Sequence, residues 1–337
     1  MRIKTNLAAL GLLATTCIAH GADLATTLPA GIYFDGLAVT DDGVIFASGV
    51  TKAAIYRAGP GQSAATSWMV PAEGDAVSIN GIALSPDQKS IYACVNRSEY
   101  MPNAPQRNAE IRRISVASGA IEATYTWTDH GFCDGLAFDG AGNLYVTDSA
   151  GNDADGKPIG TGRVLVLRKG ATTPTTWKVS KDLYGPVAAA FGNIQVNGVA
   201  VIGSDVIVNS TGTFKTYRIP IRSDGSAGDV SLIQVSRPLD TPDGLCSRGT
   251  RLFAVEVGIA FSEGGRNGRL SEAVFSGPPG LVSTAKLTTL GTGDSVASCW
   301  ATASHVYYLS SQFGKVYVPK RRGEPQTPSE VMRVPLN

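Results

Sequence analysis

Residues 241–246 read Thr-Pro-Asp-Gly-Leu-Cys, a turn that runs straight into an apolar strand. The same phrase, an Asp or Asn followed by a small residue and an apolar one, recurs at intervals of 45 to 63 residues. The other copies are Phe34-Asp35-Gly36-Leu37, Ile79-Asn80-Gly81-Ile82, Cys133-Asp134-Gly135-Leu136, Val196-Asn197-Gly198-Val199 and a degenerate Gly293-Asp294-Ser295-Val296. A repeat of this length built from short strands is typical of propeller blades.

Each copy of the phrase continues in the same way. In the third copy, apolar strands at 136–138 and 144–147 flank a tight turn at 139–143. A third strand follows, as at 163–167, and a fourth strand precedes the next copy, as at 231–235. We therefore predict an all-β fold, a six-bladed β-propeller of four-stranded antiparallel blades.

The two ends of the chain carry the strands that would close the ring. Residues 24–28 resemble a fourth strand with no blade of its own, and residues 331–335 resemble a third strand. The sixth blade is then completed by the N-terminal strand. This closure removes an open sheet edge, which would otherwise invite aggregation.

The first residues read as an export signal. Arg2 and Lys4 give a positive start, residues 7–18 are mostly apolar, and small residues follow. We predict a signal peptide at 1–21, a single propeller domain at 22–337, and a secreted or periplasmic protein. No later stretch has 18 apolar residues in a row, so we expect no transmembrane segment.

The charge balance limits the partners. Charged residues make up 17% of the 337 residues, and the formal net charge is +1. Such a chain lacks the basic surface that nucleic acid or anionic membranes require. We expect a small-molecule substrate, no nucleic acid, and a monomer.

Four cysteines follow the predicted signal: Cys94, Cys133, Cys246 and Cys299. Cys246 and Cys299 fall near the same point of two successive repeats, so a disulfide could join neighbouring inner strands. Buried free thiols are an equally good interpretation, and the state of Cys94 and Cys133 stays open. An exported protein permits disulfides.

The phrase also carries the candidate chemistry. Its Asp and Asn side chains are expected to point into the central channel, where carboxylates repel one another unless a cation lies among them. Such oxygen ligands favour Ca²⁺, with Mg²⁺ or Mn²⁺ as alternatives. The simpler alternative is that these are ordinary turn residues that cap the backbone. The residues concerned are Asp35, Asn80, Asp134, Asn197, Asp243 and Asp294.

The phrases at 197–200 and 242–245, with the six-blade rhythm, resemble the senescence marker protein/gluconolactonase family and its calcium-dependent phosphotriesterase relatives. The resemblance covers the chain after the signal and rests on short motifs. It implies a channel cation held by residues that fall on Asp35, Cys133, Asn197 and Asp243, with Asp134 beside the metal. Asp35 stands where the family has Glu, and Cys133 stands where it has Asn. Cysteine is a poor ligand for Ca²⁺, so Asn80 or Asp134 could take its place.

The resemblance implies a metal-dependent hydrolase of a lactone or related ester. Asp243 or Asp134 would be the base or nucleophile, and His130, four residues before Asp134, could move a proton. A surface loop histidine is the simpler interpretation of His130. Two other functions stay open: a non-hydrolytic enzyme like the strictosidine synthase-type propellers, and a binding or scaffold propeller without catalysis.

Overall fold

The computed structural model describes residues 21–71, 77–97, 108–127, 131–149, 162–185, 194–261, 266–276 and 283–336, and the backbone of 151–152 and 158–159. Strands dominate these residues, which confirms the prediction of an all-β propeller. The short helical segments are η1 (Lys181–Leu183), α1 (Gly314–Tyr317) and η4 (Pro319–Arg321).

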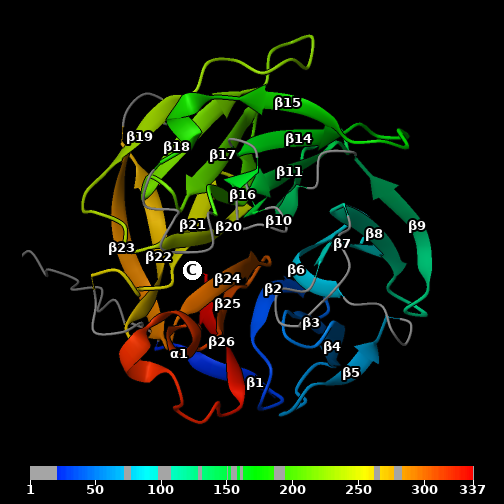
Figure 1. The fold of residues 1–337 in the computed structure, drawn as a ribbon, viewed down its shortest axis with the longest axis vertical. Coiled ribbons are helices and arrows are strands. Elements are labelled where there is room, and N and C mark those ends of the chain that lie inside the picture. The colour runs from blue at the N-terminus through cyan, green and yellow to red at the C-terminus, as the bar shows by residue number, and fades with distance from the viewer. Residues whose placement is uncertain are drawn as a thin grey trace, which may run out of the picture.

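The strands form four-stranded antiparallel units, here called blades, that surround a central axis (Figure 1). Blades 1 to 3 are β2 (Phe34–Val39), β3 (Ile45–Gly49), β4 (Ala54–Ala58), β5 (Thr66–Met69); β6 (Val77–Leu84), β7 (Ser90–Arg97), β8 (Glu110–Ser115), β9 (Ile121–Thr126); and β10 (Phe132–Phe138), β11 (Leu144–Ser149), β14 (Arg163–Leu167), β15 (Thr175–Val179). Blades 4 to 6 are β16 (Val196–Ile202), β17 (Asp205–Ser210), β18 (Lys215–Pro220), β19 (Ser231–Val235); β20 (Pro242–Arg248), β21 (Arg251–Glu256), β22 (Gly268–Phe275), β23 (Thr284–Gly293); and β24 (Val296–Ala301), β25 (His305–Ser310), β26 (Ser329–Pro335), β1 (Asp23–Leu28).

Two further pairings join parts of the ring. A short parallel pairing of β19 with β23 links the outer strands of blades 4 and 5. A small hairpin of β12 (Gly151–Asn152) and β13 (Pro158–Ile159) extends from blade 3. At the ends of the chain, β1 pairs antiparallel with β26, so the predicted closure by the N-terminal strand is confirmed.

The core lies between the blades. One cluster packs Phe34 and Tyr56 of blade 1 against Leu309 and Val331 of blade 6. Another packs Phe46 and Ile55 of blade 1 against blade 2. Burial of these apolar side chains holds each blade against the next. Within the described residues, no helix is long and apolar enough to cross a membrane.

The repeated phrase has a structural cause. In each innermost strand the pairing shifts at the phrase, for example between Pro242 and Leu245 in β20 and between Phe34 and Leu37 in β2. Such a bulge releases residues from the ladder and lets a side chain leave the plane of the blade. The Asp or Asn of the phrase occupies this position.

The glycine of the phrase is needed because the next blade comes very close. A methyl group on it would collide with the backbone of the neighbouring inner strand. The backbone oxygens in these contacts, from Gly36, Gly81, Gly135, Gly198 and Gly244 in turn, belong to Asn80, Asp134, Asn197, Asp243 and Ala297. This series identifies the equivalent position of every blade from 2 to 6.

Candidate active site

Five polar side chains surround the channel at the level of the bulges, one from each of blades 1 to 5. All but Asn80 line the cavities on both sides of this level, and Asn80 lines one of them. We call the set the polar ring: Asp35, Asn80, Asp134, Asn197 and Asp243. The sequence predicted these five positions, and the structure brings them together.

The sixth position differs from the prediction. In β24 the pairing shifts between Val296 and Ser298, so Ala297 lies where the other blades place an Asp or Asn. Asp294, expected in the ring, instead accepts hydrogen bonds from Arg321 Nη1 at 2.8 Å and Nη2 at 2.7 Å. The prediction for Asp294 was wrong because the last bulge is shorter and moves the strand start along the chain.

The carboxylates of the ring are electrostatically strained. Burial raises the pKa of Asp243 well above its usual value, and the nearby charges of Asp35 and Asp134 raise it further, against a lowering by a hydrogen bond from Asn197. Burial also raises the pKa of Asp35 to about 6, partly offset by its hydrogen bond with Asn80. A cation among these groups would relieve this strain.

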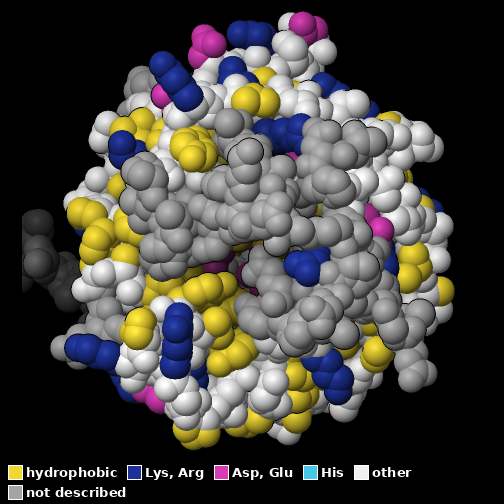
Figure 2. All heavy atoms as spheres, viewed as in Figure 1, with side chains coloured by type: hydrophobic (Ala, Val, Ile, Leu, Met, Phe, Trp, Pro, Cys, Tyr) yellow, Lys and Arg dark blue, Asp and Glu magenta, His cyan; other side chains and the backbone are white. Residues whose placement is uncertain are grey.

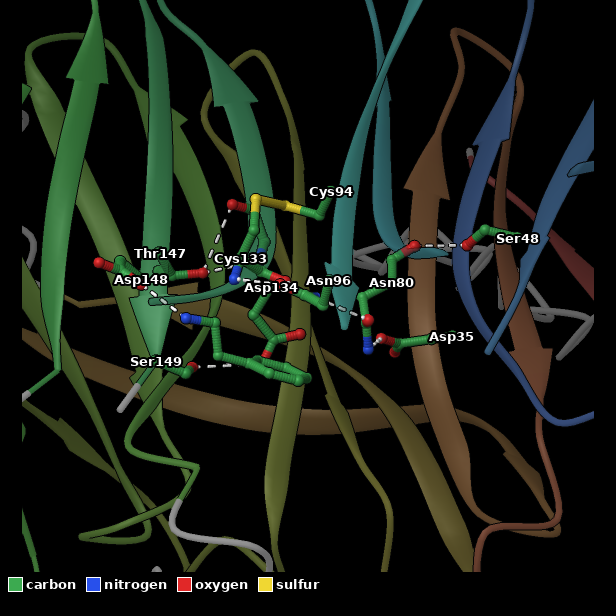
Figure 3. Close-up of a disulfide and its surroundings, with 12 residues drawn as sticks. Asp35, Ser48, Asn80, Cys94, Asn96, Cys133, Asp134, Thr147, Asp148 and Ser149 are labelled. Atoms are coloured by element: carbon green, nitrogen blue, oxygen red, sulfur yellow. Dashed lines mark hydrogen bonds between the residues drawn. A yellow bond between two sulfur atoms is a disulfide. The ribbon is translucent and has the colours of Figure 1, made fainter. Parts of the chain in front are cut away.

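A chain of hydrogen bonds fixes the orientation of Asn80 (Figure 3). The backbone N–H of Cys133 donates to Asn96 Oδ1 at 2.9 Å, so Asn96 Nδ2 faces the other way. That nitrogen donates to the Cys133 carbonyl at 2.8 Å and to Asn80 Oδ1 at 2.9 Å. Asn80 Nδ2 therefore faces Asp35 and donates to Oδ2 at 2.9 Å. Because a backbone N–H can only donate, each amide in the chain has one allowed orientation.

This orientation determines whether the Asn80 side chain can bind a cation. Its oxygen accepts hydrogen bonds from Asn96 and, at 3.3 Å, from the hydroxyl of Ser78. A nitrogen bearing two hydrogens cannot bind a cation. In this arrangement Asn80 acts as a donor that holds Asp35, whereas the sequence predicted it as a metal ligand.

At the contacts between blades, the same position of the second strand forms hydrogen bonds to the next blade. This position lies one residue before the one that pairs with the residue preceding the Asp or Asn of the phrase. Ser48 and Thr147 at this position donate to the backbone oxygens of Asn80 and Asn197 in the next blade. Asn209 donates to the backbone oxygen of Asp243 at 3.0 Å. These bonds hold the backbones of three of the five ring residues from the neighbouring blade.

In blade 2 this position is Cys94, which forms a disulfide with Cys133 of blade 3 (Figure 3). A second disulfide joins Cys246 of blade 5 to Cys299 of blade 6, which resolves the choice that the sequence left open. Because its sulfur is bonded to Cys94, Cys133 is no metal ligand. Its neighbour Asp134 is the carboxylate of β10 that lines the channel.

Two cavities meet at the polar ring. One, of about 110 Å³, lies on the face that carries α1, and its described lining includes Phe132, Ile194 and Tyr317. The other, of about 250 Å³, runs between the innermost strands towards the opposite face, with Trp300 among its lining residues. Figure 2 shows the first face, with acidic side chains at the base of a central hollow and hydrophobic side chains beside it.

Other acidic groups near the ring are already paired. Asp148 is buried against Arg163 at 2.8 Å and accepts a hydrogen bond from the Phe132 N–H, and burial raises its pKa. Glu256 binds Arg237 at 2.5 Å. These residues support the walls of the site. His130, predicted to move a proton, lies outside the described residues.

The donor chemistry of the ring fits a divalent cation, since carboxylate and amide oxygens are the ligands that Ca²⁺ prefers. Among the described residues, however, no three Asp, Glu, His or Cys side chains are close enough to hold a metal by themselves. A cation there would need the amide oxygen of Asn197, or water, as well as the carboxylates.

Comparisons with known proteins place the fold but no family. No family model matches the chain, and no curated protein matches it. A gluconolactonase from Xanthomonas campestris is similar in structure, with a TM-score of 0.61 and 13% identity over 96% of this chain and 93% of that one. A luciferin-regenerating enzyme is similar with a TM-score of 0.60 and 12% identity, over 93% of this chain and 95% of that one. A PQQ-bound aldose sugar dehydrogenase from Streptomyces coelicolor is similar with a TM-score of 0.56 and 14% identity, over 93% of this chain and 97% of that one. At these identities the likeness concerns the fold alone.

Proposed function

We propose that this propeller is a hydrolase of lactones or related esters and that it depends on a divalent cation, Ca²⁺ in the first place, bound at the polar ring. The observation that carries the proposal is the strained set of carboxylates at the base of an open cavity. The gluconolactonase with the same fold supports it. A buried cluster of like charges is a functional-site candidate, because the fold does not require it.

Asp243 and Asn197, with Asp35 or Asp134, would hold the cation. When bound, it would polarise the substrate carbonyl and lower the pKa of a water molecule. Burial and the neighbouring carboxylates raise the pKa of Asp243, and a cation would offset both effects, so Asp243 fits best as a ligand.

Hydrolysis also needs a group that takes a proton from water as the water oxygen bonds to the carbonyl carbon. The ring C–O bond of the lactone then breaks, and the leaving oxygen takes a proton, which gives a hydroxy acid. Asp134 fits this role because it lines the cavity, where its Oδ2 lies 3.3 Å from the hydroxyl of Ser149. Asp243 remains the second candidate, and His130 remains a prediction for proton transfer.

The test is metal content by mass spectrometry after mild purification, together with hydrolysis of a lactone panel. Wild type should carry one divalent cation per chain, and Asp243→Asn should lose both the cation and, by about 10²–10³-fold, the activity. Asp294→Asn is the matched control, because it removes the same charge outside the ring and should keep the metal. Absence of metal from wild type, with no effect of a chelator on thermal stability, would overturn the proposal.

One observation favours a second function, a binding propeller without a metal. The oxygen of Asn80 is engaged, and the acidic side chains among the described residues do not converge on one point. In that case the ring would bind a polar or cationic group of a small molecule. Metal-free wild type that binds ligands but hydrolyses none would support this alternative.

We also propose that the protein works in a secreted or periplasmic compartment. Two disulfides join neighbouring blades, and disulfides form and persist in oxidising environments. Fractionation of the source cells would test the location, and a protein found with reduced thiols in the cytoplasm would contradict it.

A further inference from the structure

A hydrophobic cluster lies at the mouth of the channel, above the position where the polar ring is interrupted. Its buried members are Val50, Val257, Ala297 and Phe313, and Tyr33, Ile259, Val316 and Tyr317 pack against them. We call this set the mouth cluster. It draws on blades 1, 5 and 6, which meet around Ala297.

The aromatic part of the mouth cluster is held in place. The ring of Phe313 stacks on Tyr33 with centroids 5.9 Å apart and lies 6.0 Å from the ring of Tyr317. The N–H of Gly314 donates to Ser295 Oγ at 2.8 Å, and the buried Lys315 Nζ donates to the Pro325 carbonyl at 2.8 Å. These bonds anchor α1, so the aromatic wall is a fixed surface.

This wall forms part of the cavity at the ring. Val50, Val257, Ile259, Phe313 and Tyr317 line it, and the polar ring contributes its base. No Lys or Arg is among the described lining residues. The cavity is therefore amphipathic: the carboxylates and amides of the polar ring lie at its base, and the apolar side chains of the mouth cluster, from blades 1, 5 and 6, form a wall above them.

We infer that the substrate carries an apolar substituent, an alkyl chain or an aryl group, on the lactone or ester that the ring would hydrolyse. This inference rests on the proposed function. The apolar part would pack on the mouth cluster while the carbonyl faces the ring. A polyhydroxylated sugar lactone would place hydroxyl groups against Phe313 and Val257, where they would lose hydrogen bonds to water without replacement.

The first experiment compares three lactones with the same six-membered ring: δ-decalactone with a pentyl chain, unsubstituted δ-valerolactone, and glucono-δ-lactone. Each buried methylene is worth about fourfold in specificity, from ~0.8 kcal/mol per CH₂. With two or three methylenes on the cluster, kcat/KM for δ-decalactone should exceed that for δ-valerolactone by roughly 10- to 60-fold. Glucono-δ-lactone should be the poorest of the three.

The second experiment changes the polarity of the wall without changing its shape. Val257→Thr replaces a methyl group by a hydroxyl at a buried cavity residue. It should reduce the preference for the tail, because kcat/KM for δ-decalactone should fall severalfold more than kcat/KM for δ-valerolactone. Val274→Thr makes the same replacement at a side chain that is 49% exposed outside the cavity, and it should change neither value.

Failure of the inference can be separated from failure of the proposed function. If glucono-δ-lactone is hydrolysed as well as δ-decalactone, or if the tail preference survives Val257→Thr unchanged, the inference is wrong and the hydrolase stands. If no lactone is hydrolysed, the hydrolase is wrong, and calorimetry with 6-pentylpiperidin-2-one and piperidin-2-one, the amide counterparts, decides the inference. A pentyl compound that binds at least tenfold more tightly upholds the apolar wall, and equal affinities overturn it.

Discussion

The two sides of the channel are built on the same backbone but carry opposite chemistry. Where blade 2 meets blade 3, Asn96 holds the backbone of Cys133 and the amide of Asn80, and Asp134 faces the channel. Where blade 5 meets blade 6, the apolar side chain of Val255 packs in the seam and Ala297 takes the ring position. The repeat therefore determines where a side chain lies along the channel. The type of residue at each repeated position determines whether that sector of the channel is polar or apolar.

The largest effect should come from removing the amide that organises the polar side. Asn96 is 2% exposed, and Asn96→Ala would remove the side-chain partner of the Cys133 N–H and carbonyl and the shorter of the two hydrogen bonds to the Asn80 oxygen. At roughly 1–3 kcal/mol for each buried group, the free energy of unfolding should fall by about 5 kcal/mol. Urea denaturation of purified protein measures this. A loss below about 1 kcal/mol would show that water replaces the amide easily.

The two disulfides offer a direct comparison of the two sides. They close loops of similar length, with sequence separations of 39 and 53, so each should contribute about 4 kcal/mol by restricting the unfolded chain. Cys94→Ser with Cys133→Ser should also lower lactone hydrolysis, because Cys133 adjoins Asp134 and binds Asn96.

Cys246→Ser with Cys299→Ser should cost similar stability and leave hydrolysis of the unsubstituted lactone nearly unchanged. Thermal unfolding and initial rates, measured on both double variants below their melting temperatures, make the comparison. Equal losses of activity would mean that the disulfides act on the whole ring rather than on one sector.

A smaller effect concerns pH. The folded pKa of Asp35, about 6, lies above its ordinary value of 3.8, so the folded state holds a proton that the unfolded state releases. In metal-free protein the stability from this group is present below pH 3.8 and is lost as pH rises towards 6, by about 3 kcal/mol at ~1.4 kcal/mol per pKa unit.

The control is Asp35→Asn, which should flatten this part of the stability profile. A bound cation should also flatten it, because it favours the ionised carboxylate at all these pH values. Denaturation curves at several pH values, with and without a chelator, supply the measurement. A metal-free protein whose stability rises between pH 4 and 6, equally in wild type and variant, would contradict the assignment.

The architecture could be predicted from the sequence because the phrase marks every inner strand and because residues 24–28 and 331–335 look like strands without a blade. The polar ring followed from the same repeat. The position of Ala297 could not be predicted, since the last bulge is shorter and a sequence pattern does not show where pairing shifts. In the sequence, Asp294 fits the repeated Asp/Asn phrase better than Ala297, which occupies the ring position in the structure.

The orientation of the Asn80 amide also could not be predicted from the sequence. It depends on Asn96 in the next strand and on a backbone N–H in another blade, so no local pattern contains it. The pairing of Cys94 with Cys133 was missed for a related reason. These cysteines occupy different points of the repeat, one in a second strand and one in a first strand, and only the contact between blades brings them together.

The pairing of β1 with β26 has a consequence for the order of assembly. Blades 1 to 5 each take their four strands from one segment of the chain, whereas blade 6 needs strands from opposite ends of the chain. Contacts between distant residues form late, because the loop that joins them must first be closed. Blade 6 should be the last to assemble and, by hydrogen exchange, the first to open. The apolar sector of the channel, to which blade 6 contributes Ala297 and Phe313, is then completed only when the ring itself closes.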